Sequence, residues 1–167
     1  AALMLAKAMG ANRLFGVEIN PYRIALAKKL GLVDAVFQPS EHVVEQILEA
    51  TGGRGVERAI DASASDAGRQ TAIRATREWG KIAFVGEGGP CTFYPSPDII
   101  HGQKTIYGSW VTSLWRMEEL VERLVRWGIH PQDLVTHTFP LEQAGDAYAL
   151  MAGGQCGKVA VVFDENA

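Results

Sequence analysis

The chain has 167 residues, of which 47% are hydrophobic and 21% charged, and its formal net charge is −3. This composition is typical of a globular protein that forms one domain with a real core, or one domain and a small appendage. No basic stretch is long enough to indicate a nucleic acid or an anionic membrane as a partner, and no apolar run reaches the roughly 18 residues of a membrane span. The two cysteines, Cys91 and Cys156, are isolated, which favours reduced thiols and a cytoplasmic protein over a disulfide framework or a zinc cage.

The first part of the chain alternates between predicted helices and predicted strands. The expected helices are residues 1–9, 21–31, 41–53 and 65–79, and the expected strands are residues 13–18, 34–38, 55–61, 81–89 and 104–110. The expected helix-terminal residues are Gly10, Asn20 with Pro21, Ser40 and Gly80. Because the strands are continuous apolar runs, the pattern predicts an α/β fold, a doubly wound, Rossmann-type parallel sheet with helices on both faces.

The rhythm changes after residue 110. A long amphipathic helix is expected at 113–128, a strand at 134–141, a helix at 141–154 and a last strand at 158–163. We therefore predict a dinucleotide-binding domain at 1–109, incomplete at its N-terminus, and a C-terminal segment at 110–167 that belongs to a second domain. The chain begins within a predicted helix, so the first strand of the fold and its glycine-rich phosphate turn are expected to be absent from this sequence.

Glu18 follows the strand "RLFGVE" directly and precedes a helix that opens with proline. An acid at the end of the second strand of a dinucleotide fold accepts hydrogen bonds from the ribose hydroxyls and repels a 2′-phosphate, so it favours NAD over NADP. The alternative is a solvated turn residue. Arg23, one turn into the following helix, either lies along the ribose or extends into solvent.

Other strand ends carry small residues. Glycines follow the strand in "FVGEGG", where they allow a backbone to approach a ligand closely, although an ordinary tight turn explains them equally well. "IDASAS" places small residues at the neighbouring strand end, which is compatible with a cofactor packed there.

Five segments, taken in order, resemble the C-terminal half of the medium-chain, zinc-type alcohol dehydrogenases and their threonine and polyol dehydrogenase branch. These segments are "LAKAMGANRLFGVEINPYRIALAKKLG", "EATGGRGVERAIDAS", "GKIAFVGEGG", "TIYGSW" and "FPLEQAGDAYALMAGGQCGKVAVVF". The resemblance covers essentially the whole chain. It implies that Glu18 replaces the family's ribose-binding acid, usually Asp, and that Arg23 is the basic residue beside the adenosine.

The resemblance also implies the remaining contacts. Val85 and Gly86 would meet the nicotinamide side of NAD, Gly108 and Ser109 would make a second backbone contact, and Lys158 would lie near the pyrophosphate. Ala62 and Ser63, at the strand end before Ala64, complete the expected cofactor-binding set. Ala64 departs from the glycine that is more usual at its position.

In this family a zinc held by Cys and His polarises the alcohol during hydride transfer, and the ligands lie in an N-terminal domain. None of the chain's four histidines, His42, His101, His130 and His137, matches a family ligand. We expect no metal site and no catalytic residue in these 167 residues, with zinc present only in a full-length family member. Trp110, Trp115 and Trp127 either reach a substrate or belong to the core or an interface, and the alcohol itself is not identified by the sequence.

Two other functions remain open at this point. One is a non-catalytic remnant that acts as a binding or oligomerisation module, and the other is a zinc-free, quinone-reductase-like oxidoreductase, which the acid at Glu18 disfavours. We also expect a homodimer or a higher homo-oligomer that pairs through the strand "KTIYGSW". The last strand, "KVAVVF", would normally pair inside the missing domain, so it needs a substitute partner, and we expect either disorder at this edge or a partner chain that covers it.

Overall fold

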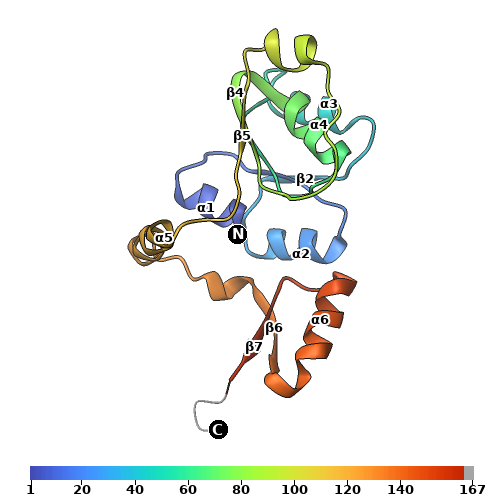
Figure 1. Cartoon of the computed structure of the whole chain (residues 1–167). Coiled ribbons are helices and arrows are strands. Elements are labelled where there is room, and N and C mark those ends of the chain that lie inside the picture. The colour runs from blue at the N-terminus through green and yellow to red at the C-terminus, as the bar shows by residue number, and fades with distance from the viewer. Residues whose placement is uncertain (164–167) are drawn as a thin grey trace. The chain divides into compact units, whose positions relative to one another are not determined.

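The computed structural model describes residues 1–163, which form two compact units (Figure 1). The terminal unit consists of Ala1–Val36 and the residues from Ser113 onward, and the central unit is Phe37–Thr112. Both contain helices and strands, as predicted for an α/β protein.

The helices alternate with strands along the chain. The helices are α1 (Ala2–Ala8), α2 (Pro21–Lys29), α3 (Val43–Ala50), α4 (Asp66–Ala75), α5 (Leu114–Trp127) and α6 (Ala144–Gly153). The strands are β1 (Phe15–Val17), β2 (Ala35–Phe37), β3 (Val56–Asp61), β4 (Thr76–Phe84), β5 (Thr105–Gly108), β6 (Val135–Pro140) and β7 (Lys158–Val162). Short helical turns occupy Ser96–Ile100, Pro131–Leu134 and Leu141–Gln143.

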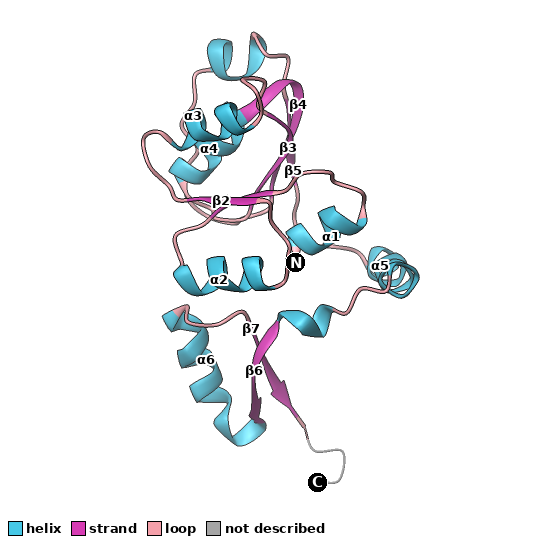
Figure 2. Cartoon of the chain, turned by 180° about the vertical axis from the view of Figure 1, so that it is seen from behind, coloured by secondary structure: helices cyan, strands magenta, loops and turns pink. Residues whose placement is uncertain are grey.

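The central unit contains a three-stranded parallel sheet in the order β3-β4-β5. Helices α3 and α4 lie together on one side of this sheet (Figure 2). Ile73 of α4 and Ile82 of β4 are completely buried where the helix meets the sheet, and Val43 and Ile47 of α3 are almost completely buried. This packing of apolar helix faces on a sheet is the main stabilising feature of the unit.

The predicted helix at 65–79 is wrong at its C-terminal end. Helix α4 stops at Ala75, and the chain continues directly into β4, where Thr76 pairs with Val56 of β3. Gly80 does not end a helix. It is buried in the strand, where an added Cβ would collide with the Thr76 side chain. Strand pairing with a segment about twenty residues away overrides the local helical pattern.

The predicted N-cap of α3 is also wrong. The helix begins at Val43 and its N-cap residue is His42, not Ser40. The Ser40 hydroxyl oxygen accepts a hydrogen bond from the His42 N–H at 3.3 Å, so it stabilises the turn before the helix. Serine side chains bond to nearby backbone in turns as readily as at helix ends.

In the terminal unit, α2 begins as predicted. The Asn20 side chain accepts hydrogen bonds from the N–H groups of Tyr22 and Arg23, and Pro21 occupies the first turn. The other end of the Asn20 amide donates to the carbonyl oxygen of Gly154 at 2.7 Å. One residue therefore caps α2 and joins it to the segment that follows α6.

The last strand has a partner within the chain. Strand β7 pairs in parallel with β6, and α6, which connects them, packs on both strands. The substitute partner that this strand was expected to need is β6, reached through a βαβ connection, and not a partner chain.

The first two strands and the next three belong to separate sheets. Within residues 1–163, β1 pairs with β2, and β3, β4 and β5 form a separate sheet. A doubly wound fold has the strand order 3-2-1-4-5-6. Strands β1 and β2 of this chain correspond to strands 2 and 3 of that order, and β3, β4 and β5 correspond to strands 4, 5 and 6, so strand 1 of the order falls between the two groups. The division therefore falls at the position of the strand that the sequence was expected to lack.

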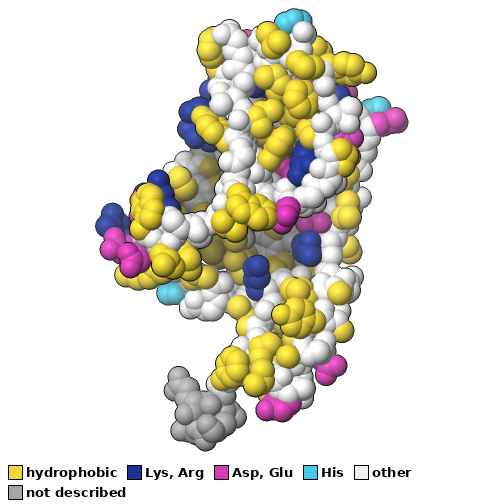
Figure 3. All heavy atoms as spheres, viewed as in Figure 1, with side chains coloured by type: hydrophobic (Ala, Val, Ile, Leu, Met, Phe, Trp, Pro, Cys, Tyr) yellow, Lys and Arg dark blue, Asp and Glu magenta, His cyan; other side chains and the backbone are white. Residues whose placement is uncertain are grey.

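Helix α5 exposes much of its apolar surface. Among the residues described, none of its side chains is buried, and Leu114 and Val125 are 81% and 79% exposed. Figure 3 shows hydrophobic and charged side chains side by side on this helix. Trp115 is exposed and Trp127 is half-buried, and Trp110, just before the helix, is exposed as well.

Candidate cofactor site

The carboxyl ends of the three parallel strands of the central unit meet at one edge of the sheet. Asp61 of β3 pairs with Phe84 of β4, and Phe84 pairs with Gly108 of β5. The pairing continues beyond the strands: the Val85 N–H donates to the Asp61 carbonyl at 2.9 Å, and the Ser109 N–H donates to the Phe84 carbonyl at 3.0 Å. Ligands of open α/β sheets bind outside this edge.

Six of the nine residues predicted to contact a cofactor lie along this edge. They are Ala62, Ser63, Val85, Gly86, Gly108 and Ser109. All are exposed except Gly86, which is half-buried. The structure thus brings these six positions together as a surface of small side chains and accessible backbone.

Asp61 holds the loop after β3 in place. Its carboxylate is 4% exposed and accepts hydrogen bonds from the Ser63 N–H at 3.1 Å, from the Ser63 hydroxyl at 2.6 Å and from the Ala64 N–H at 3.3 Å. Ala64 has a φ of +60°, in the left-handed region. This conformation explains why glycine is more usual there, because a Cβ costs about 1–2 kcal/mol in it.

The glycines after β4 are required by contact with the neighbouring loop. A Cβ on Gly86 would lie 2.5 Å from the Ala64 nitrogen, and a Cβ on Gly89 would collide with the Ala64 carbonyl. Gly89 also has a φ of +62°. The two loops therefore approach each other more closely than residues with side chains permit.

Arg69 of α4 joins these loops, and the sequence analysis did not identify it. Its side chain is 11% exposed and its Nε lies 3.5 Å from Asp61 Oδ2. Its guanidinium also donates to the carbonyl oxygens of Gly86 at 2.8 Å, Gly89 at 2.7 Å and Pro90 at 3.1 Å. No local pattern indicates these contacts, because the acceptors lie 17 to 21 residues further along the chain.

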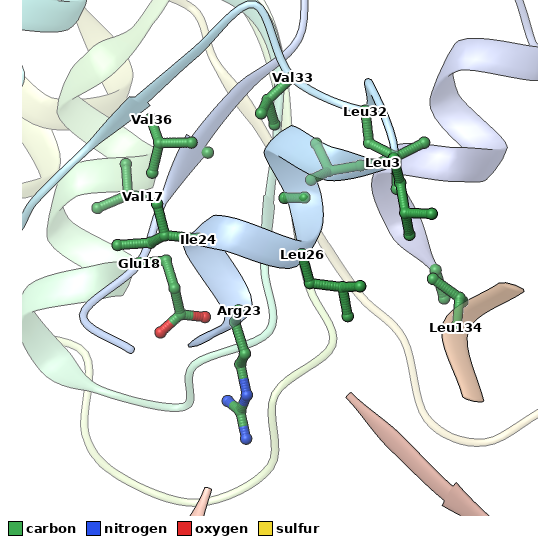
Figure 4. Close-up of a pocket in the computed structure, with 14 residues that line it drawn as sticks. Leu3, Val17, Glu18, Arg23, Ile24, Leu26, Leu32, Val33, Val36 and Leu134 are labelled. Carbon is green, nitrogen blue, oxygen red and sulfur yellow. The ribbon is translucent and has the colours of Figure 1, made fainter. Parts of the chain in front are cut away.

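The other three predicted residues, Glu18, Arg23 and Lys158, belong to the terminal unit. Glu18 directly follows β1, and Arg23 is in the first turn of α2. Both line a cavity of about 270 Å³ whose other walls are mostly apolar, including Leu3, Ile24 and Leu26. In Figure 4 the side chains of Glu18 and Arg23 lie next to each other and point away from the apolar residues.

The Glu18 carboxylate also shapes the turn in which it lies. Its Oε1 accepts hydrogen bonds from the N–H groups of Ile19 and Asn20, both at 2.9 Å. The residue is half-buried. This is the turn role that the sequence left open for Glu18, and it leaves the ribose-binding role as a prediction.

Lys158 is the first residue of β7 and is exposed. It pairs with Val135 in β6, and its carbonyl accepts a hydrogen bond from the Thr136 hydroxyl at 3.4 Å. It is not among the residues that line the cavity with Glu18 and Arg23.

Metal-binding side chains do not gather in the part of the chain that the structure describes. Across residues 1–163, no three His, Cys, Asp or Glu side chains are close enough to hold a metal ion. The residues described therefore do not fit a catalytic zinc. Both cysteines have free thiols, with Cys156 buried and Cys91 half-buried. Over the same residues, no helix is both long enough and apolar enough to cross a membrane.

Comparison with known proteins places the chain in a family. Residues 1–126 match the family model described as zinc-binding dehydrogenase. The chain is 44% identical over 164 residues to the zinc-type alcohol dehydrogenase-like protein YphC of Escherichia coli K12, with 98% of this chain and 46% of that protein covered. It is 31% identical over 167 residues to the L-threonine 3-dehydrogenase of Symbiobacterium thermophilum, with 98% and 47% covered.

A solved structure agrees with these relatives. The benzyl alcohol dehydrogenase of Acinetobacter calcoaceticus superposes with a TM-score of 0.84 at 29% identity, over 98% of this chain and 46% of that one. The chain thus spans about half the length of the relatives it matches. The family match, the relatives and the edge at which the predicted residues gather agree, and the chain belongs to the zinc-binding dehydrogenase family, corresponding to the NAD-binding half of its zinc-type alcohol dehydrogenases.

Proposed function

We propose that this chain binds NAD in a zinc-type dehydrogenase that transfers a hydride between a small alcohol or polyol and the nicotinamide. The observation that carries the proposal is the alignment of Asp61, Phe84 and Gly108, which places three loops with small, exposed residues at one sheet edge. Backbone groups at Val85, Gly86, Gly108 and Ser109 would contact the nicotinamide side, with Ala62 and Ser63 beside them. Bound NAD would supply the hydride acceptor.

We further propose that residues 1–109 act as the dinucleotide-binding domain and that residues 110–167 belong to the catalytic domain. Lys158 would then lie near the pyrophosphate, as an exposed cation. The described residues hold no metal cluster, so the zinc and most of the alcohol pocket would come from protein outside them. We place the protein in the cytoplasm, in keeping with its two free thiols.

The cofactor preference that we propose is NAD over NADP. Glu18 follows a strand end, and its carboxylate is half-buried and lies beside Arg23 in the wall of a cavity. A carboxylate there would accept hydrogen bonds from the ribose hydroxyls and repel a 2′-phosphate.

The test is a titration of a full-length form of the protein with NAD and with NADP. Replacing Glu18 by alanine or glutamine should weaken NAD binding by about 1.5–3 kcal/mol for each hydrogen bond lost to the charged acceptor. Glu18→Gln is the sharper variant, because its amide oxygen still accepts from the Ile19 and Asn20 N–H groups, so the turn is kept while the charge and one acceptor oxygen are lost. Glu18→Gln should reduce the difference between the affinities for NAD and for NADP.

Glu49→Gln, an exposed change on α3, is the control and should leave both affinities unchanged. Equal or tighter binding of NADP by the unaltered protein would overturn the proposed preference.

A further inference from the structure

Arg69 is a buried charged side chain with several contacts at the sheet edge described above. It projects from the first half of α4, and only 11% of its side chain is exposed. One nitrogen, Nη1, donates to two carbonyls, of Gly89 and Pro90, and Nη2 donates to the carbonyl of Gly86. The guanidinium also lies over the Phe84 ring, 5.5 Å from its centre. Its buried Nε makes no hydrogen bond and lies 3.5 Å from Asp61 Oδ2, so the side chain is held through Nη1, Nη2 and this ion pair. An arginine that donates to three carbonyls in this way holds the backbone that surrounds it.

The charge of Arg69 is balanced by Asp61, whose carboxylate holds the neighbouring loop. Asp61 accepts from the Ser63 N–H and hydroxyl and from the Ala64 N–H, and its Oδ2 lies 3.5 Å from Arg69 Nε. Both residues are buried. A buried charge is stable only when it is paired and hydrogen-bonded, so neither loop can move far without exposing or orphaning one of the two charges.

A second contact from the same helix holds the far end of the loop after β4. The Thr92 N–H donates to Asp66 Oδ1 at 2.6 Å. Helix α4 therefore binds residues 86–92 at both ends, through Arg69 near Gly86 and through Asp66 at Thr92.

We propose that Arg69, paired with Asp61, is a positioning residue that fixes the two loops against which the nicotinamide side of the cofactor packs. The inference rests on the proposed NAD-binding function, because Ala62, Ser63, Val85 and Gly86 all lie in the loops that the pair joins. A preorganised backbone binds a ligand without first losing loop entropy, so loosening these loops weakens binding at this end of the cofactor.

The test compares Arg69→Lys with Arg74→Lys. Lysine keeps a positive charge beside Asp61, but a single ammonium group cannot reproduce the planar fork that reaches three carbonyls. Arg74 is on the same helix and pairs with Asp98 at 3.4 Å, whereas the carbonyls of Gly86, Gly89 and Pro90 accept from Arg69, so the same substitution at Arg74 is a matched control. Thermal unfolding of both variants checks that the fold is retained.

Two measurements on the whole protein separate the possible outcomes. In hydrogen exchange without ligand, Arg69→Lys should speed exchange of amides in residues 62–64 and 86–92, and Arg74→Lys should not. In fluorescence titrations, Arg69→Lys should weaken NADH binding by about tenfold, roughly the effect of losing one hydrogen bond to a charged group. Binding of ADP-ribose, which lacks the nicotinamide, should be unchanged.

Unchanged exchange in the two loops would overturn the idea that Arg69 holds them. Faster exchange with unchanged NADH affinity would overturn its positioning role and leave the proposed function standing. If the unaltered protein binds neither NADH nor ADP-ribose, the proposed function itself is wrong, and the role of Arg69 toward a cofactor is wrong with it.

Discussion

Each of the two loops of the candidate site is bound by one aspartate: Asp61 binds the loop after β3, and Asp66 binds Thr92 in the loop after β4. The contact made by Asp66 depends on pH. The backbone N–H of Thr92 and then the side-chain amide of Gln70 lower the pKa of the Asp66 carboxyl below its ordinary value. A carboxyl with a lowered pKa in the folded protein contributes stability above the pKa of its unfolded form and loses that contribution as the pH falls through the folded value.

We therefore predict that Asp66→Asn reduces the acid sensitivity of the protein. The variant keeps an oxygen that accepts from the Thr92 N–H but has no proton to take up. Unfolding midpoints measured from pH 7 down to about pH 3 should fall less steeply for Asp66→Asn than for the unaltered chain. Glu45→Gln, at an acid in the first turn of α3, is the control and should follow the unaltered curve more closely. Identical curves for Asp66→Asn and the unaltered chain would contradict the prediction.

At the scale of elements, β5 is the edge of the three-stranded sheet. The described residues pair it with β4 on one side only, and Tyr107 in this strand is 48% exposed. An exposed edge with apolar side chains is a template for pairing with another chain. This geometry supports the expectation of a homodimer that pairs two copies of β5 across a two-fold axis.

The prediction is that the protein has twice the mass of one chain by light scattering at micromolar concentration. Tyr107→Lys should shift it toward the monomer, because a charge on an edge strand opposes strand pairing. Tyr94→Lys replaces another exposed tyrosine of the central unit, outside β5, and should leave the mass unchanged. A monomer in the unaltered protein would count strongly against this interface.

At the scale of the whole molecule, the described residues supply a candidate cofactor edge but no metal cluster. We predict that the 167-residue chain by itself binds no stoichiometric zinc and oxidises no alcohol. The reason is chemical: the hydride transfer that we propose would use a metal to polarise the alcohol oxygen, and no suitable group of side chains gathers in residues 1–163.

Metal analysis of the purified chain and an assay with NAD and a panel of secondary alcohols provide the check. A full-length zinc-type alcohol dehydrogenase serves as the positive control for both measurements. Stoichiometric zinc together with turnover above background would show that the chain has a catalytic centre of its own.

Much of the fold, and the placement of six of the nine candidate residues at one sheet edge, follow from local sequence signals. The cap at Asn20 depends on groups within three residues of it, and the strand-to-helix alternation depends on runs of about ten residues. The six strand-end residues of the central unit could be predicted because parallel strands that are neighbours in a sheet must end at the same edge. The resemblance to the zinc-type alcohol dehydrogenases depends on the order of segments along the chain, and the family match agrees with it.

Only the tertiary structure decided the features that depend on distant partners. The end of α4 at Ala75 follows from pairing of Thr76 with Val56, and β7 pairs with β6, about twenty residues before it. The contacts of Arg69 also depend on distant partners, since its acceptors are carbonyls of the loop that follows the next strand, β4. Local propensities differ by only about 1 kcal/mol per residue, whereas a buried charge without its partners costs several, so such contacts prevail over local preference and leave no periodic trace in the sequence.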